Sequence, residues 1–128
     1  MAVRLDISQA FPTTGANGYH QHLVELRDYE VSGVYAILEK RGTVMYIGES
    51  HSGRLYDTIT RHFRAWEIDP RQDSQGRRMG GMMYDRKKTR VVYLITAPGE
   101  AQAVQYEEIQ RLRPQDNTND GTATEPPF

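Results

Sequence analysis

The sequence has no cysteine, which excludes a disulfide framework and a thiolate metal site and suits a reducing compartment. It also lacks any apolar run near the ~20 residues that a membrane span requires. Its first residues do not show the charged and then apolar pattern of a secretion signal. We therefore expect a cytoplasmic protein without a membrane partner. The 128 residues suit one domain, which is long enough to bury a core.

A strong net charge is also absent, since the formal value is −1, but the charges are unevenly placed. Residues 54–90 hold ten Lys and Arg against five Asp and Glu, a local balance of +5, so the rest of the chain carries −6. A basic middle on a nearly neutral chain favours a localised contact with a polyanion such as nucleic acid. Solvated charges on an ordinary loop are the simpler alternative.

Two apolar runs rich in β-branched and aromatic residues, 33–38 and 44–48, flank a short polar link that contains a glycine. This pattern predicts a β-hairpin. If its turn centres on residues 41–42, Tyr35 and Tyr46 lie on one face as diagonal neighbours, roughly 7–8 Å apart at the backbone. A change of one residue in loop length would put them on opposite faces. The predicted cross-strand pairs are Lys40 with Thr43, Ile37 with Tyr46, and Tyr35 with Gly48.

The tripeptides Gly33-Val34-Tyr35 and Tyr46-Ile47-Gly48 resemble the paired signature of the GIY-YIG nuclease superfamily. An arginine-bearing helix follows them, and a later helix ends shortly before Asn117, so the resemblance covers residues 32–117 as a nuclease domain. Residues 1–31 would then be an N-terminal extension packed on that domain, and residues 118–128 a flexible tail.

The fold that we expect is α/β of the α+β type, with a small central sheet of three mainly antiparallel strands flanked by helices. The predicted elements outside the hairpin are a short strand at 3–7, a helix within 19–29, a helix from Arg54 with Ser52 as its N-cap, a long loop at 67–90, a strand at 90–96 and a helix up to Arg113, where Pro114 stops it.

The resemblance implies a DNA endonuclease that hydrolyses phosphodiester bonds of double-stranded DNA with one Mg²⁺ or Mn²⁺ ion per active site. It also implies a bacterial or phage-like context, and it leaves a homodimer on DNA open. By the same resemblance Tyr35 or Tyr46 helps to deprotonate or orient the attacking water, with Tyr35 favoured as general base, and Asn117 braces the site by hydrogen bonding.

The arginine of the site is assigned by position on the helix that starts near residue 54. The family arginine usually lies ten residues after the second tyrosine, where this chain has Tyr56, but some members have it eight after, at Arg54. The resemblance therefore favours Arg54 as the group that grips the phosphate, with Arg61 as the alternative on the same flank of the helix. His62 matches a histidine that some members carry later on this helix.

The metal-binding carboxylate is missing. The family has a glutamate about twelve residues before an asparagine, and counting back from Asn117 gives Gln105. A glutamine keeps the size of a glutamate and one acceptor oxygen but not the charge that holds Mg²⁺, so we expect cleavage to be weakened or lost. Glu108 is the alternative ligand, because it lies about 60° round the helix from Gln105, whereas Glu107 lies about 200° away.

The missing carboxylate keeps a second function open, a non-cleaving DNA-binding module on the same scaffold. A protein-interaction domain is a third. The basic residues of the predicted loop are expected to contact the DNA backbone and to supply affinity rather than sequence choice. They are Arg71, Arg77, Arg78, Arg86, Lys87 and Lys88.

Overall fold

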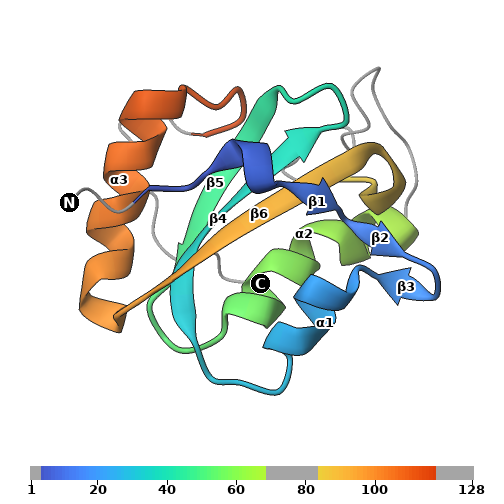
Figure 1. Ribbon diagram of the computed structural model, residues 1–128, viewed down its shortest axis with the longest axis horizontal. Coiled ribbons are helices and arrows are strands. Elements are labelled where there is room, and N and C mark those ends of the chain that lie inside the picture. Colours follow the sequence, from blue (N-terminus) through green and yellow to red (C-terminus); the bar gives the residue numbers. More distant parts are fainter. Residues whose placement is uncertain (1–3, 69–83, 118–128) are drawn as a thin grey trace.

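The computed structural model describes residues 4–68 and 84–117. Its main sheet has four antiparallel strands in the order β1-β6-β4-β5 (Figure 1). The predicted α+β class is confirmed, but the sheet has four strands rather than three, because the first strand pairs with the edge of β6. The strands are β1 (Phe11–Pro12), β2 (Thr14–Gly15), β3 (Gly18–Tyr19), β4 (Ser32–Glu39), β5 (Val44–Ser50) and β6 (Thr89–Thr96), of which β2 and β3 form a separate small sheet.

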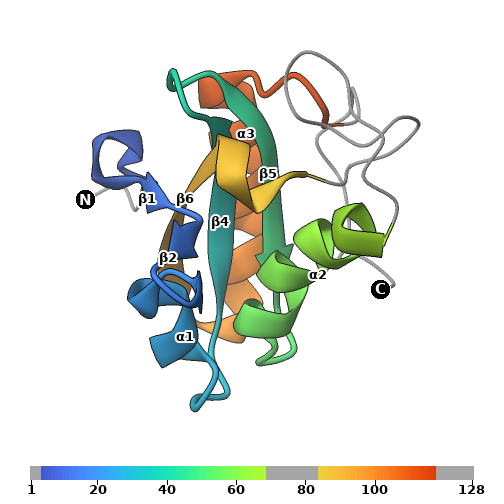
Figure 2. The ribbon, with the colours of Figure 1, turned by 90° about the vertical axis from the view of Figure 1, so that its right-hand side faces the viewer.

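Helices cover both faces of the main sheet. The helices α1 (Gln21–Leu26) and α2 (Leu55–Ile68) pack on one face, and α3 (Ala101–Leu112) packs on the other (Figures 1 and 2). Short 3₁₀ helices occupy Ile7–Gln9, Arg86–Lys88 and Pro98–Glu100, and are labelled η1, η2 and η3. In the part of the chain that the structure describes, no helix has both the length and the apolar character to cross a membrane.

Strand β4 is the centre of the core because it lies between β6 and β5. Its side chains alternate between the two faces, as the period of a strand requires. Val34, Ala36 and Leu38 belong to the cluster beneath α3, whereas Tyr35 and Ile37 belong to the cluster beneath α1 and α2. The near-continuous apolar run of this strand therefore reflects burial on both faces.

The predicted register of the hairpin is confirmed where it matters for the site. Tyr35 pairs with Gly48 and Ile37 pairs with Tyr46. Both tyrosines lie on the face that α2 covers, with ring centroids 6.2 Å apart.

The predicted turn of the hairpin is wrong, although the register survives. The amide of Glu39 donates to the carbonyl of Thr43 at 2.9 Å, so the loop contains residues 40–42 instead of two residues. Gly42 takes the positive φ of 105° that ends this turn. A β-bulge at Met45 then adds one residue to β5 and restores the predicted pairing beyond it.

The predicted strand at 3–7 is also wrong, since none of its described residues 4–7 lies in a strand. The Asp6 side chain accepts from the amide of Ser8 at 3.1 Å and caps η1 instead. Leu5 is buried, and its amide donates to the Glu108 carboxylate on α3. The alternation in the sequence thus marks a buried leucine in an irregular segment.

The three predicted helices are present, but some of their ends differ from the prediction. The helix predicted within 19–29 exists as the shorter α1. Helix α2 begins at Leu55, one residue later than predicted, so Ser52 lies too far before it to be its N-cap. It continues into the predicted loop, and β6 begins just before the end of that loop. Helix α3 ends as predicted, with Arg113 in the left-handed conformation (φ 52°) before Pro114.

Candidate active site

Two tyrosines and a histidine meet on the α2 face of the hairpin. The hydroxyl of Tyr35 lies 2.6 Å from Nε2 of His62, and the Tyr46 ring lies 4.8 Å from the His62 ring, centroid to centroid. All three side chains are buried, with exposed fractions of 0% for Tyr35 and His62 and 3% for Tyr46. The structure therefore brings His62 together with both tyrosines, as a closed cluster inside the core.

The glycines of the two tripeptides allow close packing within the sheet. A Cβ at Gly48 would clash with the ring and hydroxyl of Tyr35, which lies directly opposite it. A Cβ at Gly33 would clash with the carbonyl of Leu94 on β6. Each glycine is therefore needed for close approach across the sheet.

Burial decides the protonation of Tyr46. Removal from water raises the pKa of the Tyr46 phenol to about 12, and the negative charge of Glu49 adds to the rise. The phenol therefore stays protonated at neutral pH, so it can donate a hydrogen bond but is a weak base.

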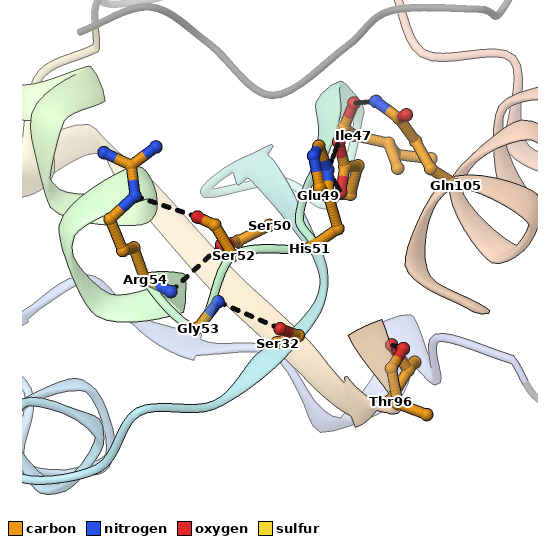
Figure 3. Close-up of polar contacts among 11 residues, drawn as sticks. Ser32, Ile47, Glu49, Ser50, His51, Ser52, Gly53, Arg54, Thr96 and Gln105 are labelled. Carbon is orange, nitrogen blue, oxygen red and sulfur yellow. Dashed lines mark hydrogen bonds and ion pairs between the residues drawn. The ribbon is translucent and has the colours of Figure 1, made fainter. Parts of the chain in front are cut away.

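The turn between β5 and α2 carries Arg54. The hydroxyl of Ser50 accepts from the Arg54 amide at 3.1 Å, and the hydroxyl of Ser32 accepts from the Gly53 amide at 3.0 Å, so both sides of the turn are tied to the sheet (Figure 3). The exposed Arg54 side chain donates through Nε to the Ser52 hydroxyl at 2.9 Å. This places a guanidinium beside the first amides of α2, where an anion is favoured.

Arg61, the alternative arginine, lies two turns further along α2 and is half-buried. The turn that carries Arg54 adjoins an open groove of about 290 Å³, lined also by Arg27, Tyr29 and Tyr56. Arg61 does not line this groove, so the two candidate arginines lie in different surroundings.

Sequence reasoning missed a carboxylate–imidazole pair at the same turn. Nδ1 of His51 lies 3.1 Å from each carboxylate oxygen of Glu49 (Figure 3). The Glu49 side chain is fully buried, whereas 42% of the His51 side chain is exposed. The signal was an acid and a histidine two residues apart at the end of a strand, which places both on one side of the chain.

Gln105 and Asn117 converge on the backbone of Ile47, the residue after Tyr46. Asn117 accepts from the Ile47 amide through Oδ1 and donates to the Ile47 carbonyl through Nδ2, both at 2.8 Å. Gln105, 1% exposed, donates through Nε2 to the same carbonyl at 3.3 Å. The structure thus brings these two predicted site residues together at the outer edge of β5, where they satisfy polar groups that none of the described strands pairs with.

Glu108, the alternative metal ligand, bonds to other groups than the Ile47 backbone. Its buried carboxylate accepts from the Leu5 amide and binds the Arg111 guanidinium, with Oε2 2.6 Å from Nε. This bond raises the pKa of Arg111. Glu108 therefore fastens the N-terminal segment to α3.

The residues present do not fit a Mg²⁺ ion, which binds oxygen ligands and usually one or two carboxylates. Because the Ile47 carbonyl can only accept, the amide of Gln105 must turn its NH₂ group toward that oxygen, and an NH₂ group cannot be a ligand of a cation. Within residues 4–68 and 84–117 no group of three or more His, Asp or Glu side chains is arranged to hold a metal ion.

Half of the predicted DNA-contacting residues can be located. Arg71, Arg77 and Arg78 lie outside the described residues. Arg86, Lys87 and Lys88 form η2, directly before β6. Lys87 and Lys88 are exposed, whereas the guanidinium of Arg86 lies over the ring of Tyr19, 5.1 Å from its centroid. Arg86 is thus held by a cation–π contact.

Comparisons with known proteins add no identification, since no protein-family model, no curated protein and no solved structure matches this chain.

Proposed function

We propose that the chain is a DNA endonuclease of the GIY-YIG type, weakened as written because Gln105 stands where a metal-binding glutamate is expected. The observation that carries this proposal is the meeting of Tyr35, Tyr46 and His62 on one face of the hairpin, in the register that the motif requires. The turn bearing Arg54 follows β5 directly. The charge balance of +5 over residues 54–90 supports a polyanionic substrate.

Each side chain has a role in this reaction. Arg54 binds the nonbridging oxygens of the scissile phosphate and stabilises the charge that grows on them. Tyr35 and His62, which bond to each other, and the adjacent Tyr46 ring hold the hairpin against α2. Asn117 holds the outer edge of β5 in place.

Position 105 controls the metal. A glutamate there would turn a carboxylate oxygen toward the Ile47 carbonyl, in place of the amide that now lies 3.3 Å away. Two oxygens at this distance repel each other unless a cation or proton lies between them. The proposed function predicts that Gln105→Glu binds one Mg²⁺ or Mn²⁺ ion rather than a proton, whereas the natural glutamine donates its own N–H to the carbonyl.

The second candidate function is a DNA-binding module that does not cut. The contact between Gln105 and Ile47 favours it, because an amide that satisfies the edge of β5 needs no ion. Both candidates share double-stranded DNA as partner and allow two copies to pair on it.

The test compares the natural chain, Gln105→Glu and the matched control Gln102→Glu, which makes the same change at an exposed position of α3. Binding to a duplex is measured against salt concentration, and nicking of supercoiled plasmid is measured with and without Mg²⁺. We expect all three proteins to bind with a steep loss of affinity as salt rises, and only Gln105→Glu to nick well above the natural chain.

The outcomes separate the candidates. If Gln105→Glu binds duplex DNA but never cuts it, the non-cleaving module is correct. If no variant shows salt-dependent binding to DNA, both candidates fail and a protein partner becomes the better explanation.

A further inference from the structure

Helix α1 begins at an imidazole that accepts a hydrogen bond. His20 directly precedes the helix, and its Nδ1 accepts from the amide of His22 at 3.1 Å, so its side chain is the N-cap. The backbone carbonyl of His20 accepts from the amides of Leu23 and Val24 at 2.9 and 3.1 Å. The ring and the carbonyl of one residue therefore hold the first amides of α1, which have no partner within the helix itself.

Only an unprotonated Nδ1 can make the capping contact. A backbone N–H is always a donor, so Nδ1 of His20 must supply a lone pair, and the neutral ring then carries its proton on Nε2. Protonation puts a hydrogen on both ring nitrogens and removes the acceptor. Histidine gains its charge near pH 6.5, whereas the common capping residues Ser, Thr and Asn do not titrate in that range. The cap of α1 is therefore sensitive to pH.

The surroundings of His20 favour its neutral form on balance. The His22 ring is stacked on it, with centroids 4.7 Å apart, and the uncharged ring of Phe11 from β1 lies 4.8 Å away. From β6 the phenol of Tyr93 packs edge-on against Phe11, with centroids 6.2 Å apart. Burial lowers the pKa of His20 most, the charge of His22 lowers it further, and the carboxylate of Glu25 acts in the opposite direction. A proton on His20 is therefore held less tightly in the fold than in the unfolded chain.

Helix α1 depends on this cap more than a longer helix would. It has six residues, fewer than a helix needs to be stable by itself, and its buried side chains are Leu23 and Leu26. Its first turn holds no acidic residue and its last turn no basic one, so charges at its ends do not replace the cap. A protonated His20 would also place a positive charge at the helix N-terminus, where the macrodipole disfavours it.

The far end of α1 leads to the groove beside the turn between β5 and α2. Arg27, Tyr29 and Glu30 follow the helix and line this groove of about 290 Å³. The same segment is tied to α2, because the carbonyl of Val31 accepts from the amide of Leu55 at 3.1 Å. Helices α1 and α2 cover the same face of the main sheet (Figures 1 and 2). A change in how firmly α1 is held therefore reaches one wall of the groove.

We propose that His20 is a pH switch that holds helix α1 at neutral pH and loosens it in acid. The neutral ring caps the helix, and the protonated ring gives up the cap and repels a protonated His22. The direction follows from proton linkage, since the pKa of His20 is lower in the fold than its ordinary value of about 6.5. The stabilising contribution is complete above that value and is lost as the pH falls below it. This inference holds whether or not the chain cuts DNA.

The experiment measures amide hydrogen exchange at about pH 7.5 and about pH 5, a range that spans the titration of histidine. Protection factors of the Leu23, Val24 and Arg27 amides are compared in the natural chain, His20→Asn, His20→Ala and His22→Gln. The natural chain is expected to lose roughly fivefold in protection in acid, as removal of an N-cap does. His20→Asn, which caps without titrating, is expected to keep its protection, and His20→Ala to show the lower protection at both pH values. His22→Gln, the control that keeps the cap, is expected to retain the switch with a midpoint at higher pH.

The titration of the ring tests the cap itself. Imidazole ¹⁵N shifts are expected to show neutral His20 in the Nε2–H form, and the amide proton of His22 is expected to shift with the same midpoint as the His20 ring. Circular dichroism and the protection of β4 amides show whether each variant keeps its fold.

Three results would overturn the inference. They are a neutral His20 in the Nδ1–H form, an acid loss of protection in His20→Asn equal to that of the natural chain, and full protection of α1 at neutral pH in His20→Ala. If His20→Ala does not fold, the comparison between the natural chain and His20→Asn decides alone.

Discussion

The buried cluster under α2 and the turn before α2 each contain a hydrogen-bonded histidine, but the two histidines differ in their exposure to solvent. In the cluster Tyr35 and His62 bond to each other at 2.6 Å with no exposure to solvent. In the turn His51 bonds to a buried carboxylate and is itself 42% exposed. A closed pair contributes to stability and fixed geometry, whereas the pair in the turn is partly exposed to solvent. The residues that define the motif are therefore buried, whereas the residues of the turn reach the surface.

The comparison predicts that changes in the cluster lower stability and changes in the turn lower activity. Three tests address this division and a fourth addresses the edge of β5, and they follow from the largest expected effect to the smallest.

Arg54→Ala is expected to lower plasmid nicking by the Gln105→Glu chain by about 10² to 10³, because the lost guanidinium stabilises charge on the phosphate in the transition state. Initial nicking rates measure the effect. Arg61→Ala is the matched control and is expected to change the rate by less than about threefold. A reversed order would assign the phosphate to Arg61.

Gly48→Ala is expected to lower the free energy of unfolding by about 3 kcal/mol, since the added Cβ clashes with the Tyr35 ring and forces the hairpin apart. Urea denaturation measures this difference. Gly99→Ala, with no atom within 4 Å of the added Cβ, is the control and should change stability by less than about 1 kcal/mol. Equal stability of both variants would mean that Tyr35 does not pack over Gly48.

Alkaline pH is expected to weaken the cluster through Tyr46, whose pKa is raised to about 12 in the fold. The unfolded chain loses this proton near pH 10 and the folded chain later, so the stabilising difference is present below pH 10 and is lost between pH 10 and 12. The loss amounts to about 2 kcal/mol. Urea denaturation of the natural chain and of Tyr46→Phe at several pH values measures it, and the variant should lose stability less steeply over this range. Parallel curves would place the Tyr46 phenol in contact with water.

Asn117→Ala is expected to cost about 1 to 2 kcal/mol of stability, because it removes both hydrogen bonds to the Ile47 backbone at the edge of β5. Asn117→Asp should cost at least as much, since it keeps the acceptor but turns a carboxylate oxygen toward the Ile47 carbonyl. Thermal denaturation compares the two. A harmless Asn117→Ala would show that the edge of β5 does not need this side chain.

Much of the fold follows from patterns that a strand or helix imposes on the sequence. The alternation of Tyr35 and Tyr46 with small and aliphatic residues sets the register of the hairpin, and two glycines mark where strands approach closely. The turn could not be predicted, because a loop one residue longer and the bulge at Met45 compensate each other and leave no trace in the alternation.

Two other features were beyond prediction for a different reason. Strand β1 is a pair of residues, Phe11 and Pro12, which is too short to show any period, so the fourth strand was missed. Glu49 binds the partly exposed His51 from a fully buried position. Charged side chains are rarely fully buried, so the sequence alone does not predict this pair. The convergence of Gln105 and Asn117 followed from the resemblance, while their shared partner Ile47 required coordinates.

The most direct test of the account is the rate at which the Gln105→Glu chain nicks supercoiled plasmid in Mg²⁺, measured beside the natural chain and beside the same variant in EDTA. The account predicts a Mg²⁺-dependent rate at least about 100-fold above that of the natural chain, because the proposed function requires a metal-binding carboxylate at position 105. Plasmid that stays supercoiled with every protein, at concentrations where the duplex is bound, would contradict it.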